Sequence, residues 1–496
     1  MTAADRGTSS GLPAGGPGAS TRPHVGIVGG GMLGLGLAAQ LAKSGHRVTV
    51  LEAAPTLGGL AAADSIGDVT WDRFYHVTLL SDSYLRELLD DIGLGDRLRW
   101  RTTRTGFFTG GRLVSMSSAL DFLMFPPLGL FAKARLGWTI FYASRVTDPA
   151  PLEQLTVVEW LTRLSGRSTV ERIWLPLLRS KLGENYRLAS AAFIWAIIAR
   201  LYAARRSGLK REMFGYVEGG YDSVLTHLRS SLEARGIEIV CGQPAADVRG
   251  DGSGSEVRFA DGTSRRFDAV VLTVPCGRVA AICPQLTAPE RERLQKVVYQ
   301  GVVCPSLLLA RPLADYYVTN ITDPGIPFTG VIEMTALVDP AAFGGRSLVY
   351  LPRYLAQDDP TWKRTDDDLV AETVATLARM YPQFRQSDVL ASRVARVREV
   401  HAISTIDYSR ALLPPLQTSI DNVFVVNSAQ IAYGTLNVNE TLALAARQSA
   451  ALTALIRPAA SAAASDRNQN GYGSALVASA RGAGSPARGP AAGAPS

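Results

Sequence analysis

The sequence predicts an α/β protein in which a parallel sheet with helices is interleaved with a second domain of mixed or antiparallel sheet plus helices. Three observations favour this class. Residues 24–51 read as strand, helix and strand, the first βαβ unit of a parallel sheet, and a glycine-rich turn joins the first strand to the helix. Strand patterns return from about residue 237, and alternating segments such as SLLLA, GVIEM and SLVYLP follow past residue 290. NVFVVNS then predicts a buried strand before a closing helix.

The charge of the chain argues against a nucleic-acid partner. The formal net charge is +7, but residues 1–24 carry +1 of it and residues 457–496 carry +3. The remaining +3 is spread over more than four hundred residues, which is too weak a field for that role.

The cysteines and the hydropathy pattern favour a cytoplasmic protein without a metal site. Cys241, Cys276, Cys283 and Cys304 lack metal-ligand spacing and fit a reducing compartment. The N-terminus has no apolar stretch typical of a signal peptide, and no uninterrupted apolar run reaches the ~18 residues of a membrane span. Association with a membrane surface remains an open alternative.

The glycine turn has the spacing of a dinucleotide-binding motif. Gly29, Gly31 and Gly34 form GxGxxG directly after the first strand, with Met32 and Leu33 at the start of the helix. The first glycine permits the tight turn, the second lets the backbone approach a pyrophosphate, and the third allows close helix–strand packing. The helix N-terminus offers free N–H groups to the phosphates.

An acid stands where this motif requires one. Glu52 and Ala53 end the second strand, and a carboxylate 18 residues after Gly34 would accept hydrogen bonds from the ribose hydroxyls. The same carboxylate would repel a 2′-phosphate. The sequence therefore predicts a Rossmann-type domain that binds a dinucleotide other than NADP.

A second glycine pair carries a family resemblance. Gly58 and Gly59 follow Glu52 by six and seven residues, and the stretch from GIVGGG to GGLAA resembles the amine oxidase, protoporphyrinogen oxidase and phytoene desaturase superfamily of flavoproteins, with UDP-galactopyranose mutase-like relatives. The resemblance implies FAD as the cofactor and a phosphate contact at the pair. The family usually has Arg or Lys next, whereas this chain has Leu60.

Three later segments extend the resemblance over most of the body. YVEGGYDSVLTHL resembles the family's glycine pair and following helix, and PAADVRGDG places Ala245 where the backbone contacts adenine. NVFVVNSAQIAYGTLNVNETLALAARQSAAL resembles the motif that closes the flavin site, and implies contacts at Ser428, Leu436 and Asn437. Asn427-Ser428 replaces the family's Gly-Asp or Gly-Glu, so the ribityl contact becomes neutral.

The resemblance implies an order of domains. We expect the FAD-binding domain to be built from three separate segments and the substrate domain to lie between them. The expected boundaries are a disordered tail 1–22, a first FAD-binding segment 23–100, a mainly helical substrate or cap region 101–215, a second FAD-binding segment 216–285, an antiparallel substrate sheet 286–415, a third FAD-binding segment 416–456 and a disordered tail 457–496.

Catalytic residues are not marked by any motif. His76, beside Tyr75 in WDRFYHVTLLSD, is a candidate acid, base or flavin contact, and the family motif brings Tyr433 and Asn437 near the ring. Lys181 and Asn439 are further candidates. A purely structural role is the alternative for each, and His227 and His401 have no recognisable partners.

Several functions compete. The leading hypothesis is removal of a hydride from an apolar or polycyclic, lipid-like small molecule, with oxygen or a quinone as acceptor because no second nucleotide motif is present. An amine oxidase is disfavoured because YQGVVCPSLLLARPL lacks the Lys that this branch often has. A UDP-galactopyranose mutase-like isomerase and a flavin-holding binding protein remain alternatives. The apolar stretches with basic ends around residues 119–145 and 193–211 could rest on a membrane, line a tunnel or be ordinary buried helices. The substrate and the oligomeric state do not follow from the sequence.

Overall fold

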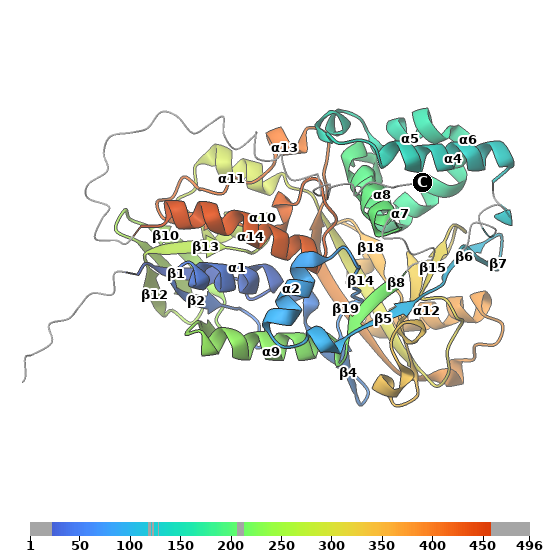
Figure 1. Ribbon diagram of the computed structural model, residues 1–496, viewed down its shortest axis with the longest axis horizontal. Helices are drawn as coiled ribbons and strands as arrows, with labels where there is room; N and C mark the ends of the chain where they lie inside the picture. Colours follow the sequence, from blue (N-terminus) through green and yellow to red (C-terminus); the bar gives the residue numbers. More distant parts are fainter. Residues whose placement is uncertain (1–21, 118–120, 122–123, 127, 206–212, 458–496) are drawn as a thin grey trace, which may run out of the picture.

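A computed structural model describes residues 22–117, 121, 124–126, 128–205 and 213–457. Most of both predicted tails lies outside these residues. The described chain has a nucleotide-binding unit beside a second unit that contains a large sheet, with a group of helices covering one end of that sheet (Figure 1).

The nucleotide-binding unit is centred on a parallel sheet. Its strand order is β20-β13-β1-β2-β9, so the first strand lies in the middle and segments far apart in sequence complete the sheet. Every strand-to-strand pairing in this sheet is parallel, which confirms the βαβ prediction. The strands are β1 His24–Val28, β2 Arg47–Leu51, β9 Glu238–Val240, β13 Ala269–Leu272 and β20 Val423–Val425.

Both faces of this sheet are covered, which is why its strands are nearly continuous apolar runs. Side chains from α1, α9 and α14 share one core with the sheet, and a three-stranded sheet with α10 and α11 forms the core of the other face. These elements are α1 Met32–Lys43, α9 Gly220–Ala234, α14 Val438–Leu455, α10 Cys276–Ile282, α11 Ala288–Gln295, β10 Ala245–Gly250, β11 Ser255–Phe259 and β12 Ser264–Phe267.

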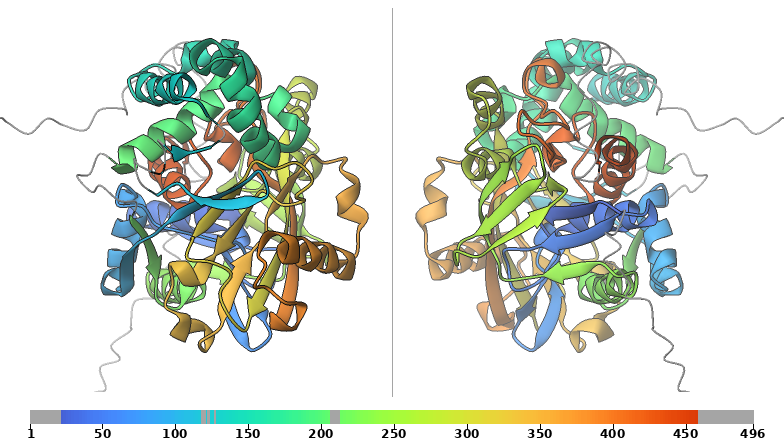
Figure 2. Two further views of the ribbon diagram at one scale, coloured as in Figure 1. Left: turned by 90° about the vertical axis from the view of Figure 1, so that its right-hand side faces the viewer. Right: turned by 90° about the vertical axis from the view of Figure 1, so that its left-hand side faces the viewer.

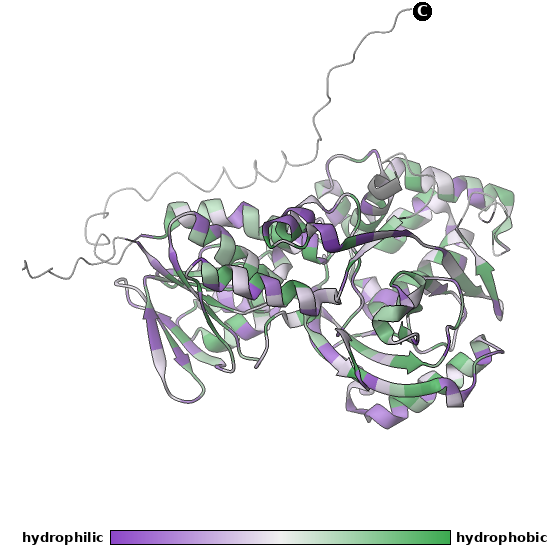
Figure 3. Cartoon of the chain, turned by 60° about the horizontal axis from the view of Figure 1, so that its bottom comes forward, coloured by the Kyte–Doolittle hydropathy of each residue, from purple (hydrophilic) through white to green (hydrophobic). Residues whose placement is uncertain are grey.

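The second unit contains an eight-stranded, mainly antiparallel sheet. Its order is β18-β14-β17-β16-β15-β6-β7, with β19 paired to β14, and only β15 and β6 pair in parallel. Hydrophobic residues run along its strands (Figure 3). The strands are β14 Tyr299–Leu309, β15 Val318–Ile321, β16 Gly330–Glu333, β17 Ser347–Tyr350, β18 Arg353–Leu355, β19 Val389–Ala402, β6 Thr105–Thr109 and β7 Arg112–Ser115.

Residues 98–115 differ from the mainly helical region expected over residues 101–215. They form three strands, two of which join the large sheet as a hairpin. Gly110 and Gly111 supply positive φ angles at the hairpin turn, and their N–H groups donate to the carboxylate of Asp323 at 2.6 and 2.7 Å. Helices follow from residue 130 to residue 205.

A helical cap lies over one end of the large sheet, and both side views place it above the two units (Figure 2). Its helices are held by a core of their own, rich in Trp, Phe and Leu. The cap consists of α4 Leu130–Ala143, α5 Val157–Ser165, α6 Arg167–Thr169, a π-helical turn Val170–Trp174, α7 Leu175–Leu182 and α8 Ala191–Arg205.

No helix among the described residues is long and apolar enough to span a bilayer.

The remaining elements connect the two units and the cap. The connecting elements are β3 Ala63–Ile66, β4 Val69–Asp72, α2 Ser83–Asp91, β5 Leu98–Thr102, β8 Met213–Val217, α12 Asp366–Met380 and α13 Tyr408–Ala411.

Candidate functional site

The turn between β1 and α1 depends on two glycines for its shape. Gly29 has a φ of 118°, and its N–H donates to the carbonyl of Leu51 at 2.8 Å. A Cβ on Gly34 would lie 1.9 Å from the carbonyl oxygen of Gly29. Only glycine at position 34 therefore lets the helix begin directly against the turn.

Glu52 closes this turn from the neighbouring strand. One carboxylate oxygen accepts the N–H of Gly30 at 2.6 Å, and the other accepts the N–H of Ala54 at 2.7 Å. Ala53, which lies between Glu52 and Ala54 in the sequence, is exposed. Gly30 was not among the predicted site residues, although it is the middle glycine of the GGG run. A carboxylate has further lone pairs, so Glu52 can still accept ribose hydroxyls.

The two glycine segments lie against each other. Gly31 and Gly58 form a parallel bridge, and the N–H of Gly58 donates to the carbonyl of Gly30 at 2.9 Å. A Cβ on Gly31 would meet only the carbonyl oxygen of Gly58, at 3.9 Å, and one on Gly59 only the Cα of Gly31, at 3.4 Å. The surface at Gly31 and Gly59 is therefore bare backbone.

The start of α1 leaves donors for a phosphate. No side chain caps the helix at Gly31, so its first N–H groups are not occupied in that way. Met32 and Leu33 are buried in the core and contribute backbone only. Leu60 is half-buried and brings no charge. The bare glycines, uncapped amides and trailing acid fit the ADP half of FAD.

The expected adenine contact lies beside the acid. Ala245 is buried at the start of β10, and its carbonyl accepts the guanidinium of Arg278 at 2.8 Å. The N–H of Gln243, two residues earlier, donates to the carbonyl of Glu52 at 3.1 Å. The structure thus brings together the two predicted contacts to the adenosine.

Asn427 and Ser428, which replace the family's Gly-Asp or Gly-Glu, have different surroundings in the structure. Asn427 is buried, accepts the N–H of Ala429 at 3.1 Å and donates to the carbonyl of Val274 at 3.0 Å. Its amide therefore braces the segment that follows β20. Ser428 is half-buried, and no hydrogen bond of its hydroxyl is found within the described chain. That hydroxyl can face a ligand.

Asn437 begins the closing helix. Its side chain accepts the N–H of Glu440 at 3.0 Å and donates to the carbonyl of Thr435 at 2.7 Å, which makes it the N-cap of α14. Leu436 just before it is half-buried. The structure gives Asn437 a capping role, which by itself explains the residue.

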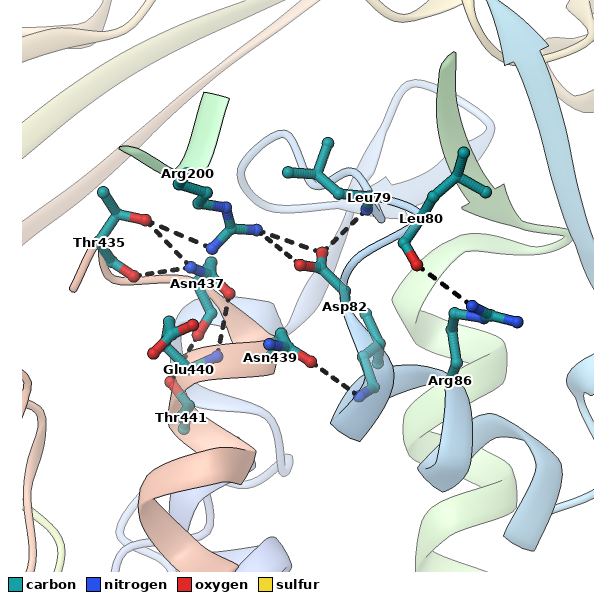
Figure 4. A network of polar contacts seen from close by, with 11 residues as sticks. Leu79, Leu80, Asp82, Arg86, Arg200, Thr435, Asn437, Asn439, Glu440 and Thr441 are labelled. Atoms are coloured by element: carbon teal, nitrogen blue, oxygen red, sulfur yellow. Dashed lines mark hydrogen bonds and ion pairs between the residues drawn. The ribbon is translucent and has the colours of Figure 1, made fainter. Parts of the chain in front are cut away.

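An ion pair that sequence reasoning missed ties the cap to this helix start (Figure 4). Arg200 of α8 donates to Asp82 at 3.0 and 3.2 Å and to the hydroxyl of Thr435 at 3.3 Å. Burial raises the pKa of Asp82, and the charge of Arg200 opposes that rise. Asn439 accepts the N–H of Leu85, so a second contact joins α14 to α2. Only long-range packing reveals these pairs, because Asp82 and Arg200 are 118 residues apart.

His76 lies beside a buried carboxylate. Its Nδ1 is 3.4 Å from Asp72, too far for good hydrogen-bond geometry, and its ring lies 4.6 Å from that of Tyr221. Asp72 also accepts the N–H of Tyr221 at 2.7 Å, at the start of α9. Asp72 was not singled out from the sequence. The carboxylate of Asp72 therefore lies next to Nδ1 of His76, and this ring nitrogen has no hydrogen-bond partner within the described chain.

Tyr433 faces the cap. Its hydroxyl donates to Ser409 at 3.2 Å, and Ser409 in turn donates to Glu153 at 2.6 Å. Burial raises the pKa of Tyr433, and the hydrogen bond with Ser409 opposes this. The hydroxyl of Tyr433 is therefore neutral near pH 7 and is already hydrogen-bonded to Ser409.

A second set of polar side chains lies between α7 and the large sheet. The ammonium of Lys181 lies 5.0 Å from the ring centre of Tyr354, whose hydroxyl is 3.0 Å from that of Tyr75. Burial, together with the charge of Lys181, lowers the pKa of His401 to about 4, so its imidazole is neutral near pH 7. His401 stands opposite Gln300 in the β14–β19 pairing. His401 thus has partners that the sequence did not reveal.

The remaining histidine named in the sequence lies on α9. His227 of α9 hydrogen-bonds to the carbonyl of Ser223 one turn earlier, at 2.8 Å. Within the part of the chain that the structure describes, no cluster of three or more His, Cys, Asp or Glu could hold a metal ion.

The sheet order, the two glycine segments and the acid between them define an FAD-dependent oxidoreductase. The chain belongs to the flavin containing amine oxidoreductase family, whose model matches residues 34–441. The family assignment confirms the resemblance predicted from the sequence, and with it the cofactor.

Curated relatives include plant desaturases. The chain is 22% identical over 416 residues to 15-cis-phytoene desaturase of Glycine max, an alignment that covers 78% of this chain and 71% of the relative. It is 35% identical over 412 residues to the enzyme of the same name from Capsicum annuum, covering 78% and 69% respectively.

Solved structures share the fold. A protein assigned as a protoporphyrinogen oxidase from Exiguobacterium sp. 255-15 has a TM-score of 0.69 at 18% identity, covering 88% of this chain and all of that one. Putrescine oxidase bound to putrescine has a TM-score of 0.67 at 18% identity, covering 87% and 99%. Reduced UDP-galactopyranose mutase has a TM-score of 0.67 at 16% identity, covering 89% and 96%.

Proposed function

We propose that this protein dehydrogenates an apolar or polycyclic, lipid-like substrate with FAD as the hydride acceptor. The observation that carries the proposal is the similarity to phytoene desaturases across 78% of the chain. When bound, FAD supplies a two-electron acceptor at N5 of its ring. The re-oxidant is oxygen or a quinone, since the chain has one nucleotide motif.

The residues that would hold FAD come from three segments. The amides that follow Gly29, with Gly58 and Gly59, would bind the pyrophosphate, and Glu52 the ribose. Ala245 would contact adenine through its backbone, and Ser428, Leu436 and Asn437 would lie along the ribityl chain and ring. The start of α14 would direct its dipole toward the ring.

The composition of β14 supports an apolar substrate over an amine. All eleven residues from Tyr299 to Leu309 are buried, and the strand contains no Lys or Arg. The lysine that the amine oxidase branch often carries on this strand is therefore missing from the whole element.

His76 is the residue that we assign to the proton. Forming a carbon–carbon double bond releases a hydride and a proton; bound FAD would supply the acceptor for the hydride, and the proton requires a base. Asp72, whose carboxylate lies 3.4 Å from Nδ1, would orient the imidazole toward the substrate. Asp72 itself would act as a positioning residue.

The test is anaerobic bleaching of the FAD-loaded protein. Separate samples receive polycyclic or isoprenoid hydrocarbons, an amine panel and UDP-galactopyranose. We expect loss of the oxidised flavin band near ~450 nm only with the apolar panel. Bleaching by amines alone would favour an amine oxidase, and turnover of the sugar nucleotide only after reduction would favour an isomerase. Either result overturns the proposal.

A His76→Gln variant tests the proton assignment. It should retain FAD but lower kcat by ~100-fold or more, because glutamine cannot accept the proton that the reaction releases. An unchanged kcat with FAD retained would remove His76 from the reaction. His227→Gln, at a half-buried histidine that hydrogen-bonds within its own helix α9, is the matched control.

A further inference from the structure

Helix α4 exposes apolar side chains to solvent and buries polar ones. Leu130 and Phe131 are 76% and 78% exposed, Trp138 is 56% exposed, and Phe141 and Tyr142 are each more than 40% exposed. Residues at these spacings recur about every turn, so they lie on one face of the helix. Ala134 and Gly137 are exposed on the same face, which carries no charged residue.

The opposite face of α4 contains polar groups and is buried. Lys133 is only 8% exposed, and the hydroxyl of Thr139 lies 2.8 Å from that of Ser165. Arg135 donates to the carbonyls of Leu164 and Arg163 at 3.1 Å each. These bonds fix the rotation of the helix, so the apolar face cannot turn inward.

The exposed apolar side chains are concentrated at this place. Among the described residues, eleven large hydrophobic side chains are exposed, and six of them lie between residues 124 and 142. Scattered exposed hydrophobics are normal on a protein surface, whereas a contiguous aromatic stripe indicates a binding face. Trp and Tyr are the residues that favour the boundary between water and hydrocarbon.

The cap around this stripe is strongly basic. Residues 130–205 contain eleven Lys and Arg against five Asp and Glu, a net charge of +6, whereas the entire chain carries +7. Arg145 lies at the end of the stripe with its guanidinium 4.9 Å from the ring centre of Phe141, and Arg163 is exposed at the end of the adjoining α5. An apolar stripe bordered by cations matches a surface of anionic headgroups over hydrocarbon.

We propose that the exposed face of α4, residues 130, 131, 134, 137, 138, 141 and 142, docks on an anionic lipid bilayer. A second copy of the chain fits less well, because a symmetric contact through the cap would bring two net charges of +6 together. Docking would place the cap at the source of a lipid-like substrate. Binding does not depend on the reaction, so it can be tested without substrate.

The experiment is flotation of the FAD-loaded full chain with vesicles. Phosphatidylcholine vesicles are compared with vesicles containing one quarter phosphatidylglycerol, at low and at high salt. We expect binding to the mixed vesicles that weakens with salt. Phe131→Ser combined with Trp138→Ser should reduce the partition coefficient by about tenfold or more. Leu390→Ser, at a side chain 52% exposed on β19, is the matched control and should bind as the wild type does.

Three results would overturn the proposal. Equal binding of the double variant and the wild type would exclude the α4 face. Equal binding to neutral and anionic vesicles would exclude the role of the basic cap. Absence of vesicle binding, with dimerisation that the double variant abolishes, would assign the face to a second copy. Retained flavin absorbance in each variant shows that the fold is intact, and none of these outcomes bears on the proposed reaction.

Discussion

Replacing Glu52 by Ala should weaken FAD binding far more than it weakens the fold. The carboxylate accepts two backbone N–H groups, at 2.6 and 2.7 Å, and Glu52 is half-buried. Water can replace the carboxylate at both amides, so we expect a loss of about 1–2 kcal/mol in the free energy of unfolding. The ribose hydroxyls lose a charged acceptor, worth a further ~1.5–3 kcal/mol of binding.

That loss corresponds to an FAD dissociation constant about tenfold to a hundredfold higher. Titration of the apoprotein, followed by quenching of flavin fluorescence, measures it directly. Glu52→Gln should be intermediate, because one oxygen can still accept. Glu238→Ala removes a carboxylate from the neighbouring strand β9 and is the control. A dissociation constant for Glu52→Ala within twofold of wild type, with the control unchanged, would refute the ribose role.

Three further changes have defined outcomes. Arg200→Met should lower the free energy of unfolding by about 3 kcal/mol because Asp82 stays buried without its cation, and adding Asp82→Asn should restore at least half of that in urea denaturation; no restoration would contradict the coupling. Burial raises the pKa of Glu333 to about 7 from 4.5, so its stabilising effect is complete below pH 4.5 and is lost as the pH rises through 7; between those limits wild type should lose up to about 3 kcal/mol relative to Glu333→Gln, and parallel pH profiles would contradict this. Lys181→Met should raise the pKa of His401 above about 4 without restoring 6.5, since burial remains, and an unmoved imidazole titration in NMR would place Lys181 elsewhere.

The part of the site that would hold the nucleotide could be predicted from the sequence because its residues are close together along the chain. Gly29 and Gly31 lie in the turn between β1 and α1, Gly34 lies in the first turn of α1, and Glu52 directly follows β2 of the same βαβ unit. Short-range spacing fixes all four. The alternating segments past residue 290 likewise predicted the antiparallel strands, because a strand's period of two is visible in its own residues.

The remainder of the site depends on contacts that no local pattern encodes. Asp82 and Arg200 meet only because the cap folds back over α14, and His401 faces Gln300 only through the register of β14 and β19. Asn437 was predicted near the ring, but its capping bond to Glu440 is visible only once the helix start is fixed. The apolar stretch around residues 119–145 left a membrane surface, a tunnel and a buried helix as alternatives, because apolar spacing alone does not show which face of α4 is exposed.

A crystal structure of the FAD-loaded protein tests the central claim most directly. We expect the pyrophosphate within hydrogen-bond distance of the amides of Gly31, Met32 or Leu33, the ribose on Glu52, and the ring at the start of α14. A cofactor bound elsewhere, or side chains filling the space in front of Gly31 and Gly59, would contradict it.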